Sequence, residues 1–277
     1  MKRPIRWLPS LNARAEAFAI IGSIAAVNAL AGKLATALHG QSLASALLSL
    51  GGVSAIIWFA LIVMLVIAGK TDKVEALAPL DRPVLASMAI LAAIPFNFGG
   101  AIAVLLGGAY LLATSASASA TRRVAVVMVA LTGPLIWGRL LLAFFGPMLL
   151  GWDAHLAAAI AGSSVQGNVV DLFGGAGRLY VALGCSSLHN MSLSILLFVV
   201  VTQMLQLRLS PALLSVCVAS AAAMAIVNIL RLATIARFPS HFEYFHVGQG
   251  GALFGLASFA AAIAVTGVGV VAVARHH

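Results

Sequence analysis

The stretch that decides the fold runs from residue 179 to residue 203 and reads "LYVALGCSSLHNMSLSILLFVVVTQ". Residues 185–190 supply a cysteine, two serines, a histidine and an asparagine, and the stretch ends in an almost wholly apolar run. Similar runs of about 20 residues, enough for a helix to cross a hydrocarbon core of about 30 Å, recur along the chain. The stretch therefore predicts a membrane helix with reactive side chains at one end.

The composition favours a membrane protein over a soluble domain. Hydrophobic residues make up 62% of the 277 residues, charged residues only 8%, and the mean hydropathy is +1.09. Lipid offers no hydrogen-bond partners to the backbone, and the apolar runs lack the alternation typical of a membrane barrel. We therefore predict an all-α, polytopic membrane helix bundle that forms one integral-membrane domain over residues 1–277.

The number of crossings depends on one ambiguous block. The clear spans are expected at residues 17–38, 46–69, 124–145, 188–207, 211–231 and 250–273. Residues 84–113 are also apolar but are interrupted by "PFNFGG" at 95–100. Two short crossings, turning at Pro95 and Gly99–Gly100, keep the flanking basic loops on the same side. This gives about eight transmembrane segments.

The formal charge of +9 is spread over short connections beside the spans, so the basic residues indicate which side of the membrane each connection faces. Because they do not form one patch, no nucleic-acid partner is expected. By the positive-inside rule, both termini are cytoplasmic; the basic residues that indicate this are Lys2, Arg3, Arg6, Arg14 and, at the other end, Arg275. The connection at 146–178 is then external. Cys185, Arg231 and His246 are expected at the same outer face.

These three residue types have complementary chemistry. A cysteine is a good nucleophile once ionised, and His246 can act as its general base and later as an acid. Arg231 stays protonated and can hold a developing oxyanion or a substrate carboxylate. Asn228 lies one helical turn before Arg231 and can orient either group. Cys217 is expected in mid-span as an inert packing residue.

Each residue also has a structural interpretation. Cys185 is compatible with an inert small residue near a helix start, Arg231 with an interfacial anchor, and His246 with a polar cap. His189, four residues after Cys185 and so about one helical turn away, is an alternative base.

Other polar features are less informative. Arg139 is an intramembrane charge that is either functional or paired with Asp153 or Asp171. The glycine-rich residues 162–177 lack the ending of a phosphate loop and are expected to form a flexible rim and not a ligand loop. No spacing of His, Cys and carboxylate residues predicts a metal site.

The order of "GCSSLHNMS" opening one span, "NILRLATIA" closing the next and "HVGQGG" opening the last resembles the exosortase/archaeosortase family of membrane cysteine transpeptidases. The resemblance covers roughly residues 179–273. It implies Cys185 as the nucleophile, Arg231 in an N-x-x-R element that begins at Asn228, and His246 in an H-x-x-x-G element that ends at Gly250. Ser186 is a supporting residue, and Ser187 stands where the family usually has glycine.

The resemblance implies a thiol protease and transpeptidase of the bacterial cytoplasmic membrane, with its active site facing the periplasm or exterior. Its substrates would be secreted proteins with a PEP-CTERM-like tail: a short motif, a transmembrane helix and a basic end. The cleaved protein would pass to a cell-surface acceptor, and no cofactor is required. The alternative is a small transporter or channel with a polar outer vestibule.

Overall fold

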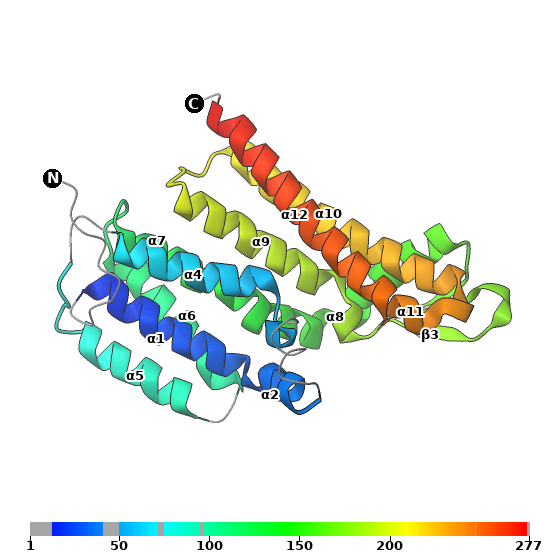
Figure 1. Ribbon diagram of the computed structural model, residues 1–277, viewed down its shortest axis with the longest axis horizontal. Helices are drawn as coiled ribbons and strands as arrows, with labels where there is room; N and C mark the ends of the chain where they lie inside the picture. Colours follow the sequence, from blue (N-terminus) through cyan, green and yellow to red (C-terminus); the bar gives the residue numbers. More distant parts are fainter. Residues whose placement is uncertain (1–12, 41–49, 71–74, 95–96, 247, 276–277) are drawn as a thin grey trace. The chain divides into compact units, whose positions relative to one another are not determined.

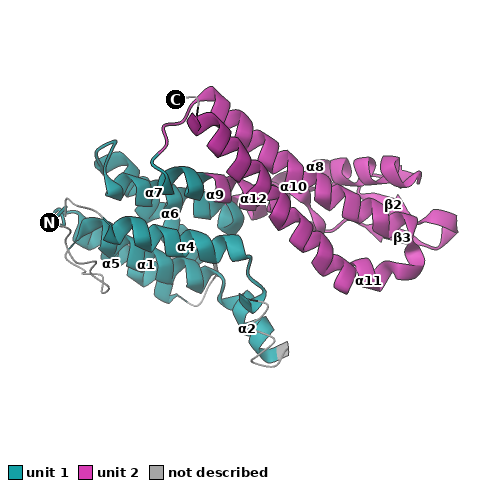
Figure 2. Cartoon of the chain, turned by 45° about the horizontal axis from the view of Figure 1, so that its top comes forward, with its two compact units in different colours: residues 1–136, 199–206 teal, residues 137–198, 207–277 magenta. Residues whose placement is uncertain are grey.

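The computed structural model describes residues 13–40, 50–70, 75–94, 97–246 and 248–275 (Figure 1). The described chain is mostly helical and divides into two compact units (Figure 2). Unit 1 comprises residues 1–136 and 199–206, and unit 2 comprises residues 137–198 and 207–277. The all-α prediction is confirmed at the level of class. Two features used in the topology prediction lie outside the described residues: the basic residues Lys2, Arg3 and Arg6, and the turn at Pro95.

Unit 1 is built around its first helix. Its elements are α1 (Arg14–Ala29), α2 (Ala31–Gly40), η1 (Leu50–Gly52), α4 (Ala55–Gly69), α5 (Asp81–Ala93), α6 (Asn97–Thr114) and α7 (Ala120–Thr132). Helix α1 packs against α4, α5, α6 and α7 (Figure 1). Small residues permit this close packing: a Cβ on Gly100 of α6 would collide with the backbone of Ala25 in α1.

One end of unit 1 contains a buried ion pair. The Arg14 guanidinium donates to the carboxylate of Asp81, with Nε–Oδ2 at 2.9 Å, and the Asp81 side chain is fully buried. Tyr110 donates its hydroxyl to the same carboxylate, and Arg14 also donates to Thr114 Oγ1. The sequence analysis used Arg14 only to predict the orientation of the N-terminus. In the structure, Arg14 joins α1, α5 and α6.

Within residues 84–113, the described part of the chain contains two helices that pack on each other, α5 and α6. The predicted position of the turn is wrong in one respect. Gly99 and Gly100 lie inside α6, because their small size is used for helix packing: a Cβ on Gly99 would collide with the carbonyl oxygen of Leu91 in α5.

Unit 2 contains the candidate site. Its helices are α8 (Gly138–Ala161), the first part of α9 (Ser187–Met204), α10 (Pro211–Arg237), α11 (Phe242–His246) and α12 (Gln249–Arg275). The short elements are β1 (Val165–Gln166), β2 (Val169–Asp171), η3 (Phe173–Gly175), β3 (Arg178–Tyr180), η4 (Leu183–Cys185) and η5 (Pro239–His241). Helices α10 and α12 lie side by side (Figure 1).

The predicted span at 124–145 and the connection after it need correction. Helix α7, the π-helical turn η2 (Gly133–Trp137) and α8 follow one another, and the helical run ends only at Ala161. The widened turn accommodates Pro134, whose ring cannot fit a regular α-helix, and Gly162 ends α8 in the left-handed conformation with φ of 69°. The connection therefore starts at residue 162, not at residue 146.

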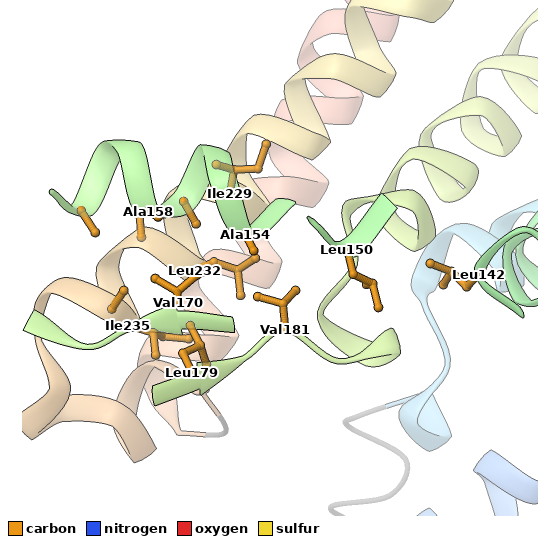
Figure 3. Close-up of a cluster of buried hydrophobic side chains, with 14 residues drawn as sticks. Leu142, Leu150, Ala154, Ala158, Val170, Leu179, Val181, Ile229, Leu232 and Ile235 are labelled. Atoms are coloured by element: carbon orange, nitrogen blue, oxygen red, sulfur yellow. The ribbon is translucent and has the colours of Figure 1, made fainter. Parts of the chain in front are cut away.

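The glycine-rich stretch contributes β1 and β2 to a small antiparallel sheet, which β3 completes in the order β1, β2, β3. Its inner face packs on α8 and α10, and Figure 3 shows Val170 and Leu179 of the sheet facing Ala154 of α8 and Leu232 of α10. Val170 and Ala154 are fully buried. This apolar cluster fixes the sheet to the helices that carry the candidate site.

The span helices agree with a multi-pass membrane protein. Among the described residues, four helical runs are long and apolar enough to cross a membrane: Ala120–Ala161, Ser187–Met204, Pro211–Arg237 and Gln249–Arg275. The count is five if α1 and α2, bent by 53° at their junction, form a single span.

Unit 2 also contains a buried hydroxyl cluster that joins three of its helices. Ser220 Oγ on α10 lies 2.7 Å from Ser194 Oγ on α9 and 2.9 Å from Thr266 Oγ1 on α12. All three side chains belong to fully buried residues. In a membrane, an apolar helix surface packs on lipid about as well as on another helix. Hydrogen bonds between hydroxyl groups therefore help to hold the helices together.

Candidate functional site

Cys185 lies at the end of η4, just before α9 begins at Ser187. Two hydrogen bonds fix this start. The backbone N–H of Ser187 donates to Asp153 Oδ2 at 2.8 Å, and that of Leu188 donates to Ser186 Oγ at 3.2 Å. These acceptors satisfy N–H groups that have no partner within the helix. Cys185 is therefore held on a short, well-anchored turn, and it is half-buried.

Asn228 of α10 links Cys185 to the next helix. Its side-chain amide donates to the backbone carbonyl of Cys185 at 2.7 Å and to Ser187 Oγ at 3.3 Å. Asn228 is only 4% exposed, so the amide is shielded from water. Asn228 therefore contacts the backbone of the cysteine and the side chain of Ser187.

Arg231, one turn further along α10, contacts the segment that carries His246. Its Nε donates to the carbonyl of Phe245 at 3.2 Å, and its Nη2 donates to the carbonyl of His246 at 2.6 Å. These carbonyls end the short helix α11 and have no partner within it. The planar guanidinium of Arg231 thus fixes the position of the last two residues of α11, Phe245 and His246.

Stacking and close packing also position His246. Its ring stacks on Phe242, with the ring centroids 5.0 Å apart. Gly250, at the start of α12, is buried, and a Cβ there would come within 2.7 Å of ring atoms of Phe245 and Tyr244. Gly250 therefore allows the start of α12 to pack directly on the aromatic residues of α11.

Cys185 and two residues of α11 pack against one apolar cluster. Cys185, Phe242 and Phe245 all pack against the same buried apolar cluster of α8, α10 and the sheet, which Figure 3 shows in part. The structure thus connects Cys185, Asn228, Arg231 and His246, which come from three separate stretches of sequence, through α10.

The alternative base His189 lies in the first turn of α9 and is half-buried. The expected helical turn between Cys185 and His189 is not formed, because Ser186 is extended, with ψ of 138°, and the helix begins after it. Two further histidines have partners of their own: His155 contacts the carbonyl of Gly151 in its own helix, and His241 contacts Ser240.

Sequence reasoning missed the role of Asp153. Asp153 and Asp171 were considered as partners of Arg139. In the structure, Asp153 caps α9 beside Cys185. Asp171 pairs with Arg178 at 3.3 Å. The signal was available in the sequence: a carboxylate in an apolar helix requires a buried partner. The sheet also had a signal, since Gly167–Asn168 between two valine-containing segments is typical of a tight hairpin.

Within the described parts of the chain, no group of three or more His, Cys, Asp or Glu side chains is arranged to hold a metal ion. Comparison of the chain with protein-family models, curated proteins and solved structures finds no match. The function is therefore argued from the residues themselves.

Proposed function

We propose that the protein is a membrane-embedded cysteine protease and transpeptidase, as the exosortase-like order of its motifs suggests. It would cleave the C-terminal sorting tail of secreted proteins and pass the shortened protein to a cell-surface acceptor. One observation carries the proposal: α10 makes hydrogen bonds to the backbone of both the cysteine and the histidine. Asn228 contacts Cys185, and Arg231 contacts His246.

In the proposed reaction, His246 removes the proton from the Cys185 thiol, and the thiolate attacks the carbonyl carbon of the scissile peptide bond. A carbon–sulfur bond forms, and the oxyanion is held by the N–H groups of Arg231 that its backbone contacts do not use. The carbon–nitrogen bond then breaks, and the imidazolium of His246 gives its proton to the leaving amine. A hydroxyl or amine of the acceptor, or water, attacks the thioester and releases the thiol.

The polar neighbours of Cys185 support covalent catalysis at this residue more than at Cys217, although both cysteines are half-buried. Cys185 stands before the start of α9, beside backbone donors and the polar residues Asn228 and Ser186. Cys217 lies within the apolar helix α10. A charged nucleophile is disfavoured in hydrocarbon and better tolerated at a polar helix end.

The proposed topology has about eight membrane segments, both termini in the cytoplasm, and Cys185 at the outer face. It rests on the basic residues of the connections, since Arg122 and Arg123 begin α7 and are expected inside. Cysteine placed at position 122, in a chain lacking Cys185 and Cys217, should resist an impermeant thiol reagent added outside. Labelling from outside would contradict this topology.

The catalytic proposal is tested by co-expressing the protein with a secreted protein from the same genome that ends in a short motif, an apolar helix and a basic tail. The wild-type protein should shorten this substrate, and Cys185→Ala and Cys185→Ser should abolish processing while the protein still inserts. Cys217→Ala is the matched control and should retain processing within about twofold, because a thiol packed among apolar atoms contributes little chemistry.

The outcome also separates the enzyme from a transporter or channel. A covalent adduct between the substrate and Cys185, detected by mass spectrometry after acid quenching, is expected only for nucleophilic catalysis. Equal processing by the Cys185 and Cys217 variants would rule out the proposed role of Cys185.

A further inference from the structure

One edge of the small sheet offers backbone groups for pairing. Among the residues that the structure describes, strand β3 pairs with β2 alone, in the strand order β1, β2, β3. The N–H of Val181 donates to the carbonyl of Asn168, and the N–H of Leu172 donates to the carbonyl of Gly177. Because the backbone groups of an antiparallel strand alternate in direction, Leu179 also faces β2. The backbone groups of Arg178 and Tyr180 therefore face the outer edge.

The segment that follows β3 borders a cavity and leads to Cys185. The cavity has a volume of about 520 Å³. Its lining residues are Leu142, Gly146, Pro147 and Leu150 of α8, Asn168 of the hairpin turn, and Tyr180, Ala182, Leu183 and Gly184. Gly184 directly precedes Cys185. The lining is uncharged and mostly apolar, which suits an aliphatic side chain.

We propose that this edge and cavity form the subsite that binds the substrate as an extended peptide. The peptide would add a strand to the outer edge of β3, and one of its aliphatic side chains would enter the cavity beside Gly184. This inference rests on the proposed function, since it places the scissile carbonyl at Cys185.

An extended peptide is the occupant that both features require. Strand addition uses the alternating donors and acceptors of Arg178 and Tyr180, which an acyl chain cannot pair with. The side chain of Leu179 points into the core and that of Tyr180 is 63% exposed, so the open face of β3 carries alternate residues. Side chains of an added strand would alternate in the same way, and every second one would lie on the side of Tyr180.

The pairing is tested by disulfide cross-linking in the full-length protein, with Tyr180→Cys placed in a chain that carries Cys185→Ala and Cys217→Ala. The probe is the tail-bearing secreted protein of the processing assay, with a single cysteine placed in turn at each of the eight residues before its apolar helix. Copper phenanthroline should give cross-link yields that alternate with a period of two. Uniform yields, or none, would overturn the strand pairing.

The cavity is tested by filling it. A Cβ on Gly146 would meet open space, so Gly146→Leu places a side chain in the cavity without a collision at its first atom. Gly255→Leu is the matched control, because Gly255 is also helical and a Cβ there also meets open space. Gly146→Leu should raise the KM for processing by about tenfold, the effect of losing a site for one buried side chain, and the control should leave it unchanged.

The two proposals fail in different ways. Processing that depends on Cys185, combined with cross-links that do not alternate, would overturn the strand subsite and leave the proposed function standing. Alternating cross-links to a substrate that is never shortened would support the subsite and contradict the catalytic proposal. An unchanged KM in Gly146→Leu would exclude the cavity as the side-chain site.

Discussion

Asn228 and Arg231 lie one turn apart in α10, and each donates a hydrogen bond to the backbone of a different segment. Asn228 contacts the carbonyl of Cys185, and Arg231 contacts the carbonyl of His246. A single rigid turn of helix therefore sets the separation between the turn that holds the cysteine and the end of α11 that holds the histidine. Both contacts are made to backbone atoms, so they act on position and not on the identity of the side chain they hold.

The first prediction concerns Asn228. Asn228→Ala leaves the carbonyl of Cys185 without this partner in a buried site, which should cost about 1–3 kcal/mol of stability. Processing should fall further than stability alone explains, because the turn before α9 loses its link to α10. The measurements are the thermal midpoint in detergent and the processing rate at a temperature at which the variant is fully folded.

The matched control for this prediction is Asn28→Ala in unit 1. Asn28 also donates its side-chain amide to a backbone carbonyl, that of Ala92, and so provides the same type of bond far from the proposed chemistry in sequence. It should lower stability to a similar degree and leave processing unchanged in the folded protein. Equal losses of processing in the two variants would show that Asn228 acts only through stability.

The second prediction concerns the fork geometry of Arg231. Arg231→Lys keeps the positive charge but cannot hold the carbonyls of Phe245 and His246 in the same planar arrangement. The processing rate should fall on the order of 10²-fold, as for loss of an oxyanion donor, while substrate binding survives. Single-turnover kinetics with saturating substrate separate the two effects.

Arg237→Lys is the control for charge alone. Arg237 lies at the end of the same helix, with its guanidinium 3.5 Å from the centroid of the Phe173 ring. Its replacement should change the rate by less than about fivefold, because an exposed cation–π contact contributes little. A similar loss of rate in both lysine variants would show that the rate does not depend on the planar contacts of Arg231.

Helical class and approximate span positions could be predicted from the sequence because they depend on apolar length alone. The expected spans at 188–207, 211–231 and 250–273 correspond to α9, α10 and α12. The boundary after residue 145 could not be predicted in the same way. A π-helical turn at Gly133–Trp137 and packing of α8 against the sheet let the helical run continue past Pro134 and Pro147 to Ala161.

The candidate site shows the same division. Motif order identified Asn228, Arg231 and His246 as a group, since these residues lie at the ends of spans. It could not show that Asn228 and Arg231 contact backbone atoms, because such contacts depend on how the turn before α9 and the helix α11 pack on α10. The role of Asp153 as a cap also depends on this packing.

The third prediction tests the hydroxyl cluster of unit 2. Ser220→Ala removes the contacts with Ser194 and Thr266, and it should destabilise the packing of α9, α10 and α12 by about 1 kcal/mol. Processing should persist at low temperature. Ser215→Ala is the control on the same helix, because Ser215 donates only to the carbonyl of Ala212 in its own helix. Denaturation in detergent monitored by circular dichroism compares the two variants, and equal midpoints would contradict a role of the cluster in stability.

The last prediction separates His246 from His189 as the general base. His246 is held by Arg231 and by stacking on Phe242, whereas His189 lies in α9 beyond the extended residue Ser186. In a Cys217→Ala chain, His246→Ala should slow alkylation of Cys185 by iodoacetamide at least about tenfold, because the thiol loses the base that ionises it. His189→Ala should alter the rate by less than about twofold. In the pH dependence of processing, the rising part of the curve, which reports a general base, should be present in the His189 variant and absent in any residual activity of the His246 variant. The reverse pattern would assign the base to His189 and would leave Cys185 as the nucleophile.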